Sequence, residues 1–171
     1  MRAYKFFSML VASVSIVFLL MALTTDYWLV AYGPRDITHS GLWQVCRDGK
    51  CFVPSEIYDY IQATCTFLIM ASLAATISVL SVAVSFTPCD QGSITGSFVA
   101  AVAAFIGGLC TFVAVVVFTA ESWGKNKESN TQLTFQWSFY LAWAAFPMLL
   151  LAGIFSLLVH LYSPRRDYES V

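Results

Sequence analysis

Four long stretches of the chain carry no Asp, Glu, Lys or Arg. They cover about residues 6–24, 61–86, 93–120 and 133–162. A bilayer core about 30 Å thick is crossed by roughly 20 apolar residues in a helix, so each stretch is long enough to span it. The stretches lack the alternation of apolar and polar residues that is typical of strands in membrane barrels. The pattern predicts an all-α membrane protein, in which a bundle of four transmembrane helices forms a single domain over residues 1–171.

The composition fits a chain that is mostly embedded in lipid. Hydrophobic residues make up 58% of the 171 residues and charged residues only 11%, against roughly 25% charged residues in soluble domains. The formal net charge of −1 gives no basic surface for a nucleic-acid partner. The first partner that the sequence predicts is therefore the lipid bilayer.

The first apolar stretch has the basic start of a secretory signal, in Arg2 and Lys5. Its apolar core is longer than that of a signal, and residues 21–24, Met-Ala-Leu-Thr, do not form an A-x-A cleavage site. We therefore expect a retained first helix. Four crossings then place both termini of this multi-pass protein on the same side of the membrane.

Charge and cysteine usage predict the orientation. Basic residues favour the cytoplasmic side near helix ends, and those near the termini lie closer to the predicted spans than those of the two longer loops. The first loop holds Cys46 and Cys51, and a disulfide between them requires an oxidising compartment. We predict that the termini are cytoplasmic, with the connection 87–92 and the tail 163–171, and that loops 25–60 and 121–132 are extracellular or lumenal.

A two-residue hairpin signal, Asp48-Gly49, lies between the two cysteines of the first loop. A type I′ turn needs positive φ at both central positions, and Asp-Gly is favoured there. With that turn, Cys46 and Cys51 form a non-hydrogen-bonded pair with Cα atoms about 4.5–5.5 Å apart, within disulfide reach. The predicted disulfide closes a short loop and contributes roughly 2 kcal/mol.

The cysteines allow other readings as well. Cys46 and Cys51 are alternatively two free thiols or half of a metal site, but His39 stands alone in the sequence and completes no zinc set. No metal and no cofactor are predicted. Cys65 and Cys110 fall inside apolar stretches and are interpreted as small apolar fillers. Cys89 lies in the short cytoplasmic connection at the membrane edge, where S-palmitoylation is a hypothesis.

The third stretch carries small residues four apart, at Gly96, Ala100, Ala104 and Gly108. This spacing puts them on one helical face, and small side chains let helices approach closely in lipid. We expect this face to pack within the four-helix bundle. A seam between two copies, or with another membrane protein, is the alternative.

Residues for transport or catalysis are not apparent. Intramembrane charges mark ion paths and proton relays, and here the one candidate is His160, near the cytoplasmic end of the fourth stretch. His39 lies across the membrane from it, and the chain has no phosphate-cradling Gly loop and no zincin helix. The sequence predicts neither a transporter nor an enzyme.

The first loop carries the pattern W…GLW…C…C, formed by Trp28, residues 41–43, Cys46 and Cys51. Between the first two helices of a tetraspan protein, this pattern resembles the claudin superfamily, which includes peripheral myelin protein, the epithelial membrane proteins and the lens fibre membrane protein. The resemblance implies a left-handed four-helix bundle with a small extracellular β-sheet in the first loop. It also implies that this sheet is anchored at the bilayer surface by Trp28, Gly41, Leu42 and Trp43.

Further stretches are similar to the branch of this superfamily found in the granules of cytotoxic lymphocytes. They are residues 25–28, 33–34 and 39–43, Glu121, Trp123, residues 137–141, Trp143 and residues 167–171. This likeness implies a protein of the granule, lysosomal or plasma membrane that supports granule trafficking and exocytosis. A paracellular pore is not expected, because the first loop is short and its few charges are of mixed sign.

The tail and the first loop leave several functions open. Tyr168 and Val171 fit the Y-x-x-Φ sorting signal of clathrin adaptors, whereas a PDZ domain would bind the free carboxylate of Val171. The third possibility is a disordered tail that no partner protein recognises. The first loop allows a role in cell–cell contact or adhesion, as in junction proteins of the superfamily. The uncharged helices also suit an accessory subunit of a larger membrane complex.

Overall fold

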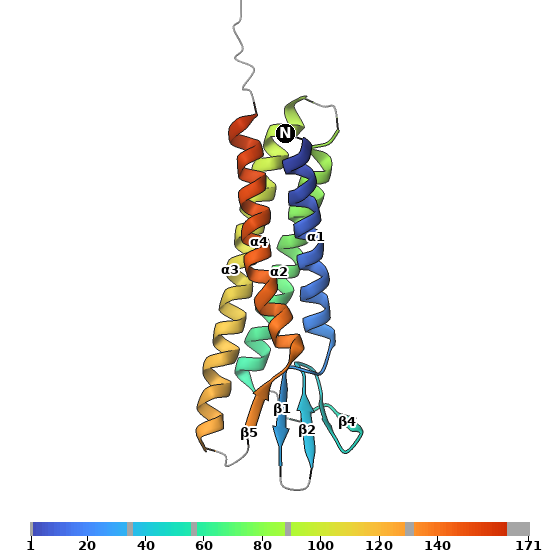
Figure 1. The fold of residues 1–171 in the computed structure, drawn as a ribbon, viewed down its shortest axis with the longest axis vertical. Coiled ribbons are helices and arrows are strands. Elements are labelled where there is room, and N and C mark those ends of the chain that lie inside the picture. Colours follow the sequence, from blue (N-terminus) through green and yellow to red (C-terminus); the bar gives the residue numbers. More distant parts are fainter. Residues whose placement is uncertain (1, 34–35, 56–57, 88–89, 129–131, 164–171) are drawn as a thin grey trace, which may run out of the picture.

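The computed structural model describes the chain over residues 2–33, 36–55, 58–87, 90–128 and 132–163, with the backbone alone at 90–95 and 125–128. Four helices lie side by side along the molecule (Figure 1): α1 Arg2–Thr24, α2 Asp59–Val84, α3 Asp90–Glu128 and α4 Trp137–Tyr162. Helices α1 and α3 each pack against both α2 and α4. All four helices are long and apolar enough to cross a membrane, so the protein is an integral multi-pass membrane protein.

A small sheet caps one end of the bundle (Figure 1). Its strands are β1 Leu29–Tyr32, β2 Ile37–Ser40, β3 Val45–Arg47, β4 Lys50–Phe52 and β5 Gln132–Phe135. They pair antiparallel in the order β4-β3-β2-β1-β5. The start of α1 and the end of α4 lie at the opposite end of the bundle. The predicted fold class, four apolar helices with a small sheet between the first two, is confirmed, and β5 adds a strand from between α3 and α4.

The third and fourth helices differ from the expected spans. Helix α3 continues to Glu128 rather than ending near residue 120, because the polar residues that follow end the membrane-spanning stretch without breaking a helix. The fourth helix was expected from residue 133, but Gln132–Phe135 form β5 and α4 begins at Trp137. The N–H of Gln136 donates to the carbonyl of Trp28 at 3.0 Å. This hydrogen bond continues the antiparallel pairing of β5 with β1, which covers an edge of β1 that would otherwise be open.

The bundle is packed with small residues inside and large apolar residues outside. Helix α2 shows this plainly, since Ala71 and Ala75 are fully buried whereas Leu73 and Leu80 are exposed. Lipid tails are as apolar as leucine, so helices in a membrane associate through close packing rather than by removing large side chains from water. The exposed leucines are therefore suited to face lipid.

The small-residue face of α3 packs within the chain. A Cβ added at Gly96 would lie 2.8 Å from the carbonyl oxygen of Ser81 in α2. Ala100 and Ala104 are fully buried, and the Ser78 hydroxyl donates to the carbonyl of Ala100 at 2.9 Å. Gly108, the last small residue of this face, packs against the side chains of Leu149 and Leu150 in α4. These contacts agree with the intramolecular reading of the stripe.

Candidate functional site

The junction between sheet and bundle is organised around Trp28. Its side chain is fully buried, and its indole Nε1–H donates to the carbonyl of Ala22 at the end of α1, at 2.6 Å. The ring meets Phe118 of α3 edge-on, with 4.7 Å between ring centroids, and Phe139 of α4 at 6.0 Å. Trp28 thus ties the start of β1 to three helices at once.

The Gly41-Leu42-Trp43 segment closes the same junction from the other side. A Cβ at Gly41 would lie 2.6 Å from the Cα of Asp26, so only glycine fits this close approach. Leu42 is buried beneath the sheet. Trp43 is half exposed, and its Nε1–H donates to the carbonyl of Leu23 at 2.6 Å. The motif is therefore a structural clamp between the first loop and α1.

The cysteine hairpin has the predicted turn and register, although its two cysteine Cα atoms lie closer together than the predicted distance of about 4.5–5.5 Å. Asp48 and Gly49 have φ of 52° and 75°, the positive values that a type I′ turn needs. The register pairs Cys46 with Cys51, which form a disulfide with a Cα–Cα distance of 4.0 Å. Cys46 is almost fully buried, whereas Cys51 is exposed. The predicted disulfide is confirmed.

His39 does not stand alone, which corrects the expectation from the sequence. The register of β2 and β3 places it directly opposite Cys46, and the nearest ligand atoms of His39, Cys46 and Cys51 all lie within 4.8 Å of one another. The imidazole also stacks on the Tyr27 ring, with 4.9 Å between ring centroids and 4° between planes. The sequence could have predicted this pair if β2 and β3 had been assigned as a hairpin joined by residues 41–44. Ser40 would then pair with Val45, and His39 with Cys46.

An exposed ion pair accompanies the hairpin. The Arg47 guanidinium donates to the Asp36 carboxylate at 2.7 Å. This hydrogen bond, followed by the charge of Asp36, raises the pKa of Arg47 above its usual value. Because solvent screens exposed pairs, the contact orients the hairpin more than it stabilises the fold.

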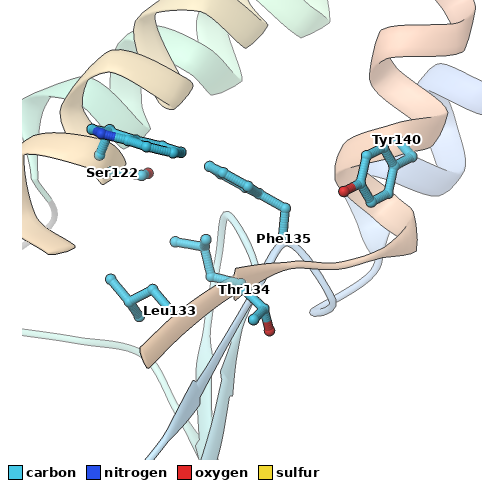
Figure 2. A pocket seen from close by; sticks show the side chains of 7 residues that line it. Ser122, Leu133, Thr134, Phe135 and Tyr140 are labelled. Atoms are coloured by element: carbon cyan, nitrogen blue, oxygen red, sulfur yellow. The ribbon is translucent and has the colours of Figure 1, made fainter. Parts of the chain in front are cut away.

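A cavity of about 320 Å³ opens where β5 meets the ends of α3 and α4 near the sheet (Figure 2). Its walls are Leu29, Ser122, Trp123, Leu133, Thr134, Phe135 and Tyr140. Ser122 is 3% exposed, and its hydroxyl has no hydrogen-bond partner in the part of the chain that the structure describes. The cavity suits an apolar group, and those of its wall residues that the structure describes carry no carboxylate, imidazole or thiol for acid–base or nucleophilic chemistry. Sequence reasoning missed it, because it depends on β5.

The other predicted site residues are dispersed. Cys89, Tyr168 and Val171 lie outside the described residues, so their modification and sorting roles stay predictions. His160 lies at the end of the bundle away from the sheet, with its ring 5.2 Å from that of Phe98. Cys65 is buried under the sheet, with its thiol 4.0 Å from the carbonyl of Leu42.

Comparison with known proteins agrees with this architecture. Residues 4–156 match the PMP-22/EMP/MP20/Claudin family. Protein NKG7 from Homo sapiens is 36% identical over 171 residues, covering 100% of both chains. Protein NKG7 from Mus musculus is 38% identical over 152 residues, or 89% of this chain and 88% of the relative.

A second kind of relative has a lower identity. The lens fiber membrane intrinsic protein from Rattus norvegicus is 30% identical over 147 residues, or 84% of each chain. These matches cover the four helices and the clamp around Trp28 together, and they confirm the resemblance seen in the first loop. The chain belongs to the PMP-22/EMP/MP20/Claudin family.

Proposed function

We propose that this protein is a non-enzymatic tetraspan protein of cytotoxic granules or related lysosomal membranes, where it supports granule trafficking and exocytosis. The observation that carries the proposal is the likeness to Protein NKG7 over the whole chain. The same likeness to natural killer cell granule proteins is visible in the sequence, from residues 25–28 to the tail.

The geometry supports a scaffolding role over transport or catalysis. The helices pack through alanine, glycine and serine, and the polar side-chain groups of the cavity beside the sheet are the hydroxyls of Ser122, Thr134 and Tyr140 and the indole N–H of Trp123. In this proposal the sheet faces the granule lumen or the cell exterior, where its disulfide is favoured. Both termini then face the cytoplasm, and the C-terminal tail is available to adaptor proteins.

The tail provides the route to the granule in this proposal. Tyr168 and Val171 form a Y-x-x-Φ signal a few residues beyond the end of α4. An adaptor would bind the segment in an extended form, with these two side chains in separate pockets. Sorting by this signal moves the protein from the cell surface to granules.

Localisation tests the proposal. We would tag the N-terminus, leave Val171 free and express the protein in cytotoxic lymphocytes. We expect it in perforin-containing granules, with Tyr168→Ala moving it to the cell surface and Ser170→Ala, at a position that the signal leaves free, having no effect. An unchanged distribution of Tyr168→Ala contradicts the sorting role, and exclusion of the unmodified protein from granules contradicts the granule function.

A second candidate function, cell–cell contact, is favoured by exposed apolar side chains on the sheet. Ile37, Phe52 and Val53 are each more than half exposed, and Phe52 ends β4, one of the two edge strands of the sheet. Apolar residues at a sheet edge are a common contact surface. We would express the protein in cells that do not adhere and measure aggregation, with Phe52→Ser as the variant. Concentration of the protein at cell–cell borders, together with aggregation that Phe52→Ser abolishes, would favour the contact role over the granule role.

A further inference from the structure

Three potential metal ligands form a row across the sheet. His39 in β2 is directly opposite Cys46 in β3, and Cys46 is directly opposite Cys51 in β4. Directly opposite residues of antiparallel strands lie on the same face of a sheet. One imidazole and two sulfur atoms therefore gather on one face, within 4.8 Å of one another.

The ligand types select the class of metal. Thiolates and imidazole suit Zn²⁺ and other thiophilic ions, whereas Ca²⁺ and Mg²⁺ prefer oxygen ligands. Zinc binds sulfur at about 2.3 Å and imidazole nitrogen at about 2.0 Å. The two sulfur atoms are bonded to each other in the disulfide, so after reduction rotation of the cysteine side chains has to separate them, while His39 stays directly opposite Cys46. Arg47 and Lys50 are adjacent to the cysteines in sequence, so the alternation along a strand places them on the other face.

The disulfide controls access to this site. We propose that when a thiol reductant opens Cys46–Cys51, the two cysteines and His39 bind one Zn²⁺ ion, with water in the fourth position. The zinc ion then joins β2, β3 and β4, whereas the disulfide joins only β3 and β4. The hairpin remains fastened to the sheet in both redox states.

The redox step is an ordinary thiol–disulfide exchange. A reductant thiolate attacks the sulfur of Cys51, which is exposed, and releases Cys46 as the thiolate. A second reductant thiol resolves the mixed disulfide, so that two reductant thiols become one disulfide and two protein thiols form. Zinc binding then displaces the protons of Cys46 and Cys51.

His39 is held in place for this role. Its ring stacks on Tyr27 with 4.9 Å between centroids, and its backbone position is set by the pairing of β2 with both β1 and β3. The imidazole is partly exposed, so the metal has a path from solvent. These restraints favour a three-ligand site over a simple dithiol chelate.

Cobalt and zinc titrations test the proposal. We would purify the full chain in detergent, reduce it with a phosphine, remove the phosphine without oxygen and titrate Co²⁺ and then Zn²⁺. We expect one Co²⁺ per chain, seen as a thiolate charge-transfer band that Zn²⁺ removes. The oxidised protein and the Cys46→Ser/Cys51→Ser double variant, which keeps the other cysteines, should show no such band.

The contribution of the histidine is tested separately. His39→Ala and His39→Gln should weaken zinc binding by at least about 10-fold. Thr38→Ala, on the same strand but the opposite face, should leave the zinc affinity unchanged. Circular dichroism of each variant reports whether the fold is retained. The proposal is overturned if the reduced protein shows no stronger Co²⁺–thiolate band than the cysteine double variant. If both histidine variants keep the Zn²⁺ affinity of the unmodified protein, His39 is not a ligand and the site is a chelate of two thiolates.

Discussion

The two ends of the helix bundle are held together in different ways. Near the sheet, large aromatic side chains meet, with Trp28 between Phe118 and Phe139. At the opposite end, the aromatic side chains are more exposed and most of the buried side chains are small, as where the Ser8 and Ser156 hydroxyls share a hydrogen bond of 2.7 Å. The first arrangement fills space between helices, and the second brings helix backbones close together.

The contrast follows from what each end must join. The sheet end couples a β-structure to helices, and their surfaces leave gaps that only a bulky side chain fills. The opposite end contains helices alone, which pack closely through small residues in lipid. We therefore expect the sheet end to be sensitive to loss of volume and the opposite end to gain of volume.

The largest effect is expected for Trp28→Ala. The substitution removes a fully buried ring and the hydrogen bond to Ala22, and large-to-small changes at such sites cost about 3–5 kcal/mol. Unfolding in mixed micelles, followed by circular dichroism of the helices, measures the loss. Trp43→Ala is the matched control, because its ring is half exposed and a smaller loss is expected. Equal losses for the two variants would contradict the role of Trp28 as the filler of the junction.

A gain of volume should destabilise the other end by less. A Cβ at Gly96 would lie 2.8 Å from the Ser81 carbonyl oxygen, so Gly96→Ala forces α2 and α3 apart at a cost of about 1–3 kcal/mol. Gly124→Ala, on the same helix, adds a Cβ that lies more than 4 Å from every described residue outside its own helical turn, and it should be stabilising by about 0.5–1 kcal/mol. The same micelle titration compares them. If both variants behave alike, close packing at Gly96 is unimportant.

The sequence predicts the helices well because each has to cross a bilayer. Long apolar stretches without charges leave helices as the natural choice in lipid, and the Asp48-Gly49 turn predicts the hairpin through φ requirements alone. Local rules of this kind depend on few neighbours. They identify both the number of crossings and the pairing of Cys46 with Cys51.

The parts that the sequence leaves open depend on contacts between distant segments. Gln132–Phe135 continues an apolar stretch, and its strand form follows only from pairing with β1, which is far away in the chain. The position of His39 opposite Cys46 requires the register of β2 and β3. The cavity requires β5 and α3 together. Hydrophobic periodicity carries no information on such pairings.

Of the changes at Trp28, Gly96 and Ser122, the one at Ser122 in the cavity is expected to have the smallest effect, and it should raise stability rather than lower it. Ser122 is buried with an unpaired hydroxyl among the described residues, and a buried polar group without a partner costs about 1–3 kcal/mol. Ser122→Ala removes that group while leaving its neighbours in place, so we expect stability to rise by about 1 kcal/mol.

Ser138→Ala is the control, because this serine is also buried near the sheet but shares a hydrogen bond of 2.6 Å with Thr25. It should lower stability by a similar amount, so the two variants should shift the micelle titration in opposite directions. A loss of stability in Ser122→Ala as large as that in Ser138→Ala would mean that the Ser122 hydroxyl has a partner, such as a bound lipid or water, in the folded protein.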